Sequence, residues 1–176
     1  MRIIIFLFFL LPINLLAQSE SNNFKIDDTG LIWQRVFESN QSPKTIYANL
    51  KQQKELVNVE LIDSVIVGDI SELSLMYKEA GLKWGNTAVY VSGMNTFASF
   101  KIDFKENRYR VTISGIKMTM KSSLERNRNN ESFTSLQDIE VKNGIIKPGF
   151  LKKESVAYNY SFIQLFKPKN RSNDNW

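Results

Sequence analysis

The sequence contains no cysteine and no histidine among its 176 residues. Without these residues there is no disulfide, no thiol nucleophile, no histidine general base and no zinc site of the usual Cys/His kind. The sequence also lacks a glycine-rich phosphate loop and a serine-centred nucleophile elbow. We therefore predict no cofactor, no metal site and no catalytic residue. A chain of this length buries about 70% of its unfolded surface, so it needs no metal or disulfide to fold.

Long apolar runs are also scarce, and the clearest one lies at the N-terminus. Nine apolar residues, Ile3 to Leu11, follow Met1-Arg2 directly. This run is about half of the ~20 residues needed to span a bilayer. One positive charge, a short apolar run, a proline and the small Ala17 are typical of a secretory signal peptide.

We therefore predict a signal peptide over residues 1–17, cleaved near Ala17. The mature protein would be periplasmic or extracellular and would have no transmembrane helix. Residues 18–23 are polar and are predicted to form a flexible leader. A single domain should follow over residues 24–167, with a disordered tail over residues 168–176.

Several segments of the domain carry recognisable local signals. Ser42-Pro43 is a helix start, because serine caps free N–H groups and proline has none to lose at the first helical position; the helix should reach about Glu55. Residues 122–135 lack apolar periodicity and are predicted to be a mobile loop. Residues 155–166 fit a helix or a strand, and we prefer the helix. Strands are predicted over three ranges, residues 30–37, 57–67 and 73–77, with a turn or bulge at Gly68-Asp69.

The strongest local pattern covers residues 97–120 and predicts a hairpin with Glu106-Asn107 at its turn. Asparagine tolerates the left-handed backbone of tight hairpin turns. Asp103 should then lie opposite Arg110 on the solvent face, and a slip of one residue would bury both. On the buried face the register pairs Phe104 with Tyr109, Ile102 with Val111 and Phe100 with Ile113.

Four strings carry a resemblance to a known family: Gly30-Leu31-Ile32-Trp33, Ile46-Tyr47, Phe100-Lys101-Ile102-Asp103-Phe104 and Asn107-Arg108-Tyr109-Arg110-Val111. They follow a signal peptide in the order strand, Ser-Pro helix and strand meander. Over about Phe24 to Met120 the chain resembles small exported bacterial proteins labelled a domain of unknown function with a TATA-binding-protein-like (TBP-like) fold. The resemblance implies an antiparallel sheet backed by two helices, and no activity.

We predict an α+β fold in which an antiparallel sheet of about five strands carries two helices on one face. The fold that gives the family its name binds DNA through its sheet, but a function does not follow from a fold alone. An exported protein would rarely meet DNA, so we predict no nucleic-acid partner.

Charge is unevenly distributed along the chain. Residues 18–96 contain 7 basic and 10 acidic residues, whereas residues 97–176 contain 15 and 8. In the predicted hairpin, only Asp103 offsets four cations on the solvent face. Such a cluster is typical either of a solvated face that discourages aggregation or of a site for an anionic partner. The four cations are Lys101, Lys105, Arg108 and Arg110.

Two interpretations of function remain. The first is a non-enzymatic binding module of the cell envelope that uses this basic face for an anionic envelope component or an acidic protein surface. The second is a carboxylate-dependent hydrolase, which would need two carboxylates close together in a cleft. An Asp-Thr-Gly string at Asp27-Asp28-Thr29-Gly30 resembles the catalytic loop of aspartic proteases, but the chain has no second copy, and a turn explains it. Candidate carboxylates are Asp27, Asp28, Glu60, Asp63, Asp69 and Glu72.

Aromatic residues could line a ligand pocket, but at strand spacing they are more typical of a core because each buries a large area. The residues concerned are Trp33, Trp84, Tyr90, Phe97, Phe100 and Phe104.

Overall fold

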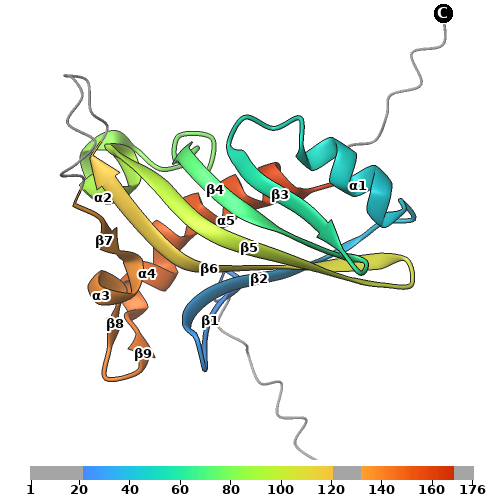
Figure 1. The fold of residues 1–176 in the computed structure, drawn as a ribbon. Coiled ribbons are helices and arrows are strands. Elements are labelled where there is room, and N and C mark those ends of the chain that lie inside the picture. The colour runs from blue at the N-terminus through green and yellow to red at the C-terminus, as the bar shows by residue number, and fades with distance from the viewer. Residues whose placement is uncertain (1–21, 121–131, 169–176) are drawn as a thin grey trace, which may run out of the picture.

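A curved antiparallel sheet wraps around a C-terminal helix, α5 (Glu154–Phe166), in the computed structural model, which describes residues 22–120 and 132–168 (Figure 1). The strands of this sheet are β1 (Phe24–Asp27), β2 (Gly30–Glu38), β3 (Leu56–Ile62), β4 (Val65–Ser74), β5 (Met94–Lys105), β6 (Arg108–Met120) and β7 (Thr134–Ser135). The other elements are α1 (Pro43–Leu50), the 3₁₀ turn η1 (Trp84–Asn86), α2 (Val89–Ser92), α3 (Leu136–Glu140), β8 (Val141–Lys142), β9 (Ile145–Ile146) and α4 (Pro148–Lys152).

The α+β prediction is confirmed, although the predicted count of about five strands is too low. The main sheet of the described residues has seven strands in the order β1-β2-β6-β5-β4-β3, with β7 paired to β6. β8 and β9 form a separate two-stranded hairpin. The prediction missed β1 and β7 because they have only four and two residues, too few for an alternating pattern to be visible.

The predicted single strand over residues 57–67 is also wrong. Its branched residues belong to two strands, β3 and β4, which turn back on each other at Asp63-Ser64. The φ angles of Asp63 and Ser64 are 45° and 67°, in the left-handed region that is uncommon for residues other than glycine. The Gly68-Asp69 pair, predicted as a turn or bulge, lies inside β4 and opposite a bulge in β3: Val57 pairs with Asp69 and Glu60 with Val67, so two residues of β3 face Gly68.

The β5–β6 hairpin follows the predicted register. Phe104 pairs with Tyr109 and Asp103 with Arg110, around a turn in which Asn107 has a φ of 54°. The same register places Ile102 opposite Val111 and Phe100 opposite Ile113. Because alternate residues of a strand point to opposite faces, one face of the hairpin is apolar and the other charged.

The two longest helices, α1 and α5, contribute to the same core on one face of the sheet. The side chain of Ser42 caps α1 as predicted, accepting a hydrogen bond from the Thr45 backbone N–H at 3.2 Å. α1 ends at Leu50 rather than near Glu55, because the chain turns there: the Gln53 N–H donates to the Leu50 carbonyl. The helix preferred for residues 155–166 is confirmed as α5.

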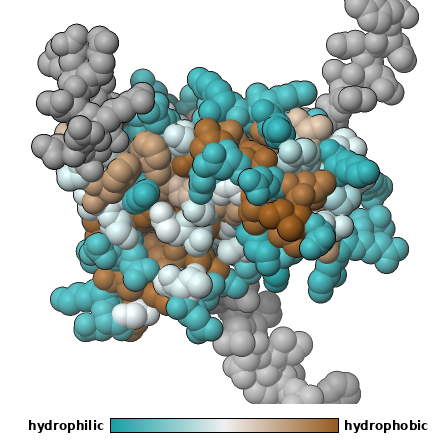
Figure 2. Space-filling view, viewed as in Figure 1, coloured by the Kyte–Doolittle hydropathy of each residue, from teal (hydrophilic) through white to brown (hydrophobic). Residues whose placement is uncertain are grey.

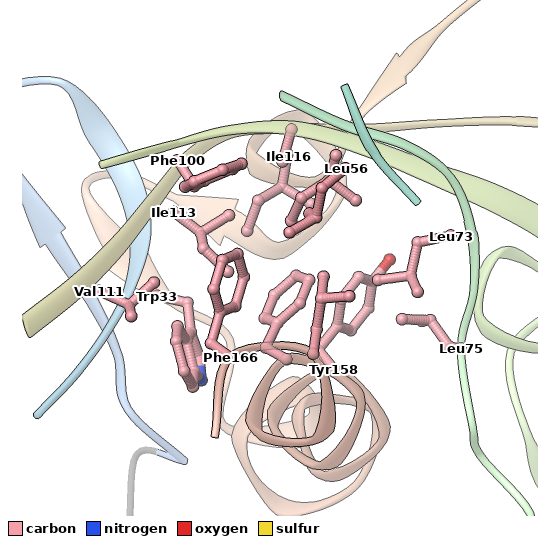
Figure 3. Close-up of a cluster of buried hydrophobic side chains, with 14 of the residues drawn as sticks. Trp33, Leu56, Leu73, Leu75, Phe100, Val111, Ile113, Ile116, Tyr158 and Phe166 are labelled. Carbon is pink, nitrogen blue, oxygen red and sulfur yellow. The ribbon is translucent and has the colours of Figure 1, made fainter. Parts of the chain in front are cut away.

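The core surrounds α5, as Figure 3 shows for side chains that reach it from several strands. Trp33 packs edge-on against Phe162 at 5.4 Å between ring centroids, and Phe100 packs against Phe166 at 5.0 Å. Polar contacts tie the sheet to the same helix. The Tyr109 hydroxyl donates to the Phe166 carbonyl at 2.5 Å, which satisfies one of the carbonyls left free at the helix C-terminus.

Some predicted segments lie outside the described residues. They are the signal peptide, residues 18–21 of the leader, residues 122–131 of the loop and residues 169–176 of the tail. Asn22 and Asn23, at the end of the predicted leader, hydrogen-bond to Ser155 and Asn159 of α5. Within the described ranges, none of the helices combines the length and the apolar character required to cross a bilayer.

Gly68 provides a test of how tightly the sheet packs. A Cβ atom added there would lie 2.7 Å from Cζ of Phe100 and 3.2 Å from the Val57 carbonyl oxygen. We expect Gly68→Ala to lower the free energy of unfolding by about 1–3 kcal/mol in urea titrations, because the added methyl group overpacks the core. Gly149→Ala is the control, because its Cβ would have no neighbour within 4 Å. Equal stability of the two variants would contradict this account.

Candidate functional site

The outer face of the sheet, opposite α5, is open to solvent around the β5–β6 turn. Val36 of β2, whose Cα pairs with that of Arg110, is 49% exposed there. Ile62 of β3 is 51% exposed on the same face. The β5–β6 register places the four predicted cations on this face, and all four are exposed. We call Lys101, Lys105, Arg108 and Arg110 the basic cluster.

Asp103 forms ion pairs with two members of the basic cluster, Lys101 and Arg110. One of its carboxylate oxygens lies 2.8 Å from Nζ of Lys101, and the other accepts a hydrogen bond from Nη2 of Arg110 at 3.1 Å. Partial burial alone would raise the pKa of Asp103, but hydrogen bonds from Lys101 and Arg110, and their charges, outweigh burial and lower it. The carboxylate is therefore held ionised, and both cations are held in place.

A hollow of about 250 Å³ lies beside this ion-paired centre. Lys105, Arg108 and Arg110 line it together with Asp103 and the exposed side of Val36; Phe104 and Tyr109 complete its lining. Lys101 does not line the hollow, although the sequence predicted it with the other three cations. It lines a separate open trough of about 540 Å³ farther along the outer face.

The trough is the place where the structure brings predicted carboxylates together. Asp27, Glu60 and Asp69 line it. Asp69 already accepts hydrogen bonds on both oxygens, from the Ser99 hydroxyl at 2.9 Å and the Asn58 amide at 3.0 Å. Within residues 22–120 and 132–168, no group of three or more acidic side chains is placed to hold a metal ion.

Asp27 has a structural role in the turn between β1 and β2. Its carboxylate accepts hydrogen bonds from the Thr29 hydroxyl at 2.7 Å and the Thr29 N–H at 2.8 Å, and these bonds lower its pKa. The Asp-Thr-Gly string is therefore part of a hairpin turn, as its composition indicated. Asp63 lies in the β3–β4 turn, and neither Asp63 nor Glu72 lines the trough.

One carboxylate–phenol pair was not among the residues predicted from the sequence. The Tyr90 hydroxyl donates to Oε1 of the buried Glu140 at 2.7 Å, and burial together with this bond raises the pKa of Tyr90. The pair joins α2 to α3 across 50 positions of the chain. No local spacing signals such a contact.

The aromatic residues divide between core and surface. Trp33 and Phe100 are buried in the core as expected, and Phe104 is half-buried against it. The expectation that Trp84 lies in the core is wrong, because its side chain, in η1, is 73% exposed.

Comparison with solved structures gives two similar proteins. A TBP-like protein from Parabacteroides distasonis ATCC 8503 has 18% identity and a TM-score of 0.46, over 81% of this chain and 91% of that chain. A DUF4468 family protein from Bacteroides ovatus ATCC 8483 has 13% identity and a TM-score of 0.44, over 85% and 93%. The name of the first contains the fold, and the name of the second the kind of bacterial family, that the sequence resemblance predicted. No family model and no curated protein matches the chain.

Asp103→Asn tests the ion-paired centre of the basic cluster. At pH 7 we expect a loss of about 1 kcal/mol or less in the free energy of unfolding, because exposed ion pairs contribute about 0.2–1 kcal/mol each. Since the folded state lowers the pKa of Asp103, its contribution exists above the unfolded value of about 3.9 and disappears as the pH falls through the folded value.

Urea titrations at pH 7 and at several acidic pH values measure this difference. The control is Glu106→Gln in the adjacent turn, whose carboxylate has no ion pair among the described residues. A stability gap for Asp103→Asn that persists unchanged below the folded pKa would show that the carboxylate acts by other means.

Proposed function

We propose that the protein is an exported, non-enzymatic binding module of the bacterial cell envelope, and that its basic cluster binds an anionic partner. The observation that carries this proposal is the hollow on the outer face. Three exposed cations, Lys105, Arg108 and Arg110, surround it, and Asp103 is the acidic residue in its lining. The signal-peptide pattern of residues 1–17 supports export.

The chemistry of the hollow suits a partner with an anionic group next to an apolar one. Two arginines can each present two parallel N–H donors to a carboxylate, sulfate or phosphate, which gives both strength and orientation. Val36 adds an exposed apolar wall. A volume of about 250 Å³ is close to the lower limit of small-molecule pockets, so the hollow suits one head group or one side chain.

The carboxylates of the trough support binding rather than hydrolysis. A hydrolase needs one carboxyl that is free to give up a proton and another that is free to attack or to activate water. Asp69 uses both oxygens to hold Ser99 and Asn58, and Asp27 holds the turn at Thr29. The structural contacts already made by these two groups favour the binding module over the carboxylate-dependent alternative.

Reversal of two charges at the hollow tests the proposal directly. We expect Lys105→Glu/Arg108→Glu to elute from immobilised heparin, a polyanion, at a clearly lower salt concentration than the wild-type protein. The reason is that the variant loses electrostatic contacts between its cations and the polyanion, and salt weakens such contacts strongly. Lys51→Glu/Lys54→Glu changes the net charge equally, and neither residue, just past the end of α1, lines the hollow. Equal shifts for both variants would overturn the proposal, because only net charge would then matter.

A photoreactive residue at position 36 tests whether a partner uses the hollow in intact cells. Val36 lines the hollow without contributing charge, so its replacement by p-benzoylphenylalanine leaves the basic cluster complete. We expect a specific crosslinked adduct at position 36 and none at position 62, which is similarly exposed on the same face. Adducts at neither position would contradict a partner at this site.

A further inference from the structure

The β8–β9 hairpin projects from the molecule at the end far from the β5–β6 turn (Figure 1). Its two strands are joined by Asn143-Gly144, with φ angles of 53° and 73°. Two consecutive positive φ angles are the signature of a type I′ turn, which matches the natural twist of a hairpin. The tip is therefore a defined structural element.

Alternation along β9 separates an inner from an outer isoleucine. Ile146 packs against the hydrophobic core, whereas Ile145 is 68% exposed at the tip. An isoleucine exposed to this extent loses the favourable free energy that burial of its side chain would give. Among the described residues, no apolar surface covers Ile145. Its side chain is therefore available to an apolar environment outside the protein.

The base of the hairpin is firmly anchored. The Lys147 N–H donates to the Glu140 carbonyl at 2.8 Å, closing the hairpin on α3. Immediately afterwards, Phe150 is buried and packs edge-on against Phe24 at 5.0 Å between ring centroids. The tip is therefore presented on a fixed support, which lowers the entropic cost of docking.

The charged residues of the hairpin and of the segment that follows it are all basic. Residues 141–153 contain four lysines and no aspartate or glutamate. Lys142 and Lys152 are exposed and have no ion pair among the described residues, whereas Lys153 lies 3.5 Å from Glu154. In Figure 2, hydrophilic residues adjoin hydrophobic ones at the lower left, where Figure 1 places this hairpin.

We propose that the β8–β9 tip docks on a bilayer containing anionic phospholipids. Ile145 would enter the boundary between head groups and acyl chains, while Lys142 and Lys152 meet lipid phosphates. An exposed apolar side chain within a basic surface is the combination that membrane-surface elements use, because each part adds to the attraction. A soluble polyanion would satisfy the lysines but not Ile145. This site lies apart from the basic cluster and goes beyond the function proposed above.

The cysteine-free sequence allows a direct test, because Ile145→Cys creates a unique labelling position. We expect an environment-sensitive NBD fluorophore at position 145 to brighten several-fold and shift to the blue on vesicles with phosphatidylglycerol. Pure phosphatidylcholine vesicles and heparin should leave its emission unchanged. The control is Val89→Cys, an apolar residue that is 61% exposed on α2. No change at position 145, equal changes at both positions, or the same response to heparin would overturn the proposal.

Charge reversal separates this site from the basic cluster. We expect Lys142→Glu/Lys152→Glu to reduce cosedimentation with phosphatidylglycerol vesicles by more than about tenfold, since each lysine near an anionic surface contributes about a fivefold factor. Lys51→Glu/Lys54→Glu, with the same net charge, should change it by less than about twofold. If vesicle binding is instead lost only in Lys105→Glu/Arg108→Glu, the membrane contact is made by the basic cluster and the proposal for the β8–β9 tip is wrong.

Discussion

Burial of α5 in the concave face of the sheet is the interaction on which the rest of the structure depends. The helix contributes five buried apolar side chains, and strands from both halves of the chain pack against them. At roughly 25 cal/mol for each Å² of apolar surface removed from water, aromatic side chains dominate this contribution. Polar ties then fix the position of the helix: Asn159 accepts hydrogen bonds from Asn23 and Trp33, and Ser161 accepts one from the Met76 N–H.

The position of the basic cluster is a consequence of that burial. Strand residues alternate between faces, so once Phe100, Ile102 and Val111 face α5, Lys101 and Arg110 must face the other way. A slip of one residue would bury these charges against the helix at a high free-energy cost. The core therefore determines the register of the hairpin, and the register determines which charges meet on the outer face.

Sequence reasoning succeeded where the decisive contacts are local. The β5–β6 hairpin joins residues 3 to 26 positions apart within one continuous segment, so its alternating pattern and its Asn107 turn predict the register and the cluster. It failed at Asp63-Ser64. Both residues are common in turns, but the branched side chains on either side of them fit one continuous strand, and the sequence does not show that both residues adopt positive φ angles. Lys101 is separated from the hollow because the hairpin residues that line it lie between positions 103 and 110, nearer the turn, and spacing does not encode the extent of a hollow.

The fold places the excess positive charge of the second half of the sequence in separate parts of the molecule. Eight of the 15 basic residues of the second half lie in the basic cluster or in residues 141–153, which include the β8–β9 hairpin, and these two regions lie toward opposite ends of the molecule (Figure 1). β5 alone has 12 residues, and at the usual rise per residue it spans roughly 40 Å. This length is several times the screening length of about 8 Å at physiological ionic strength. We therefore expect the two proposed sites to act independently, so that docking at a membrane through one would leave the other free for an anionic partner.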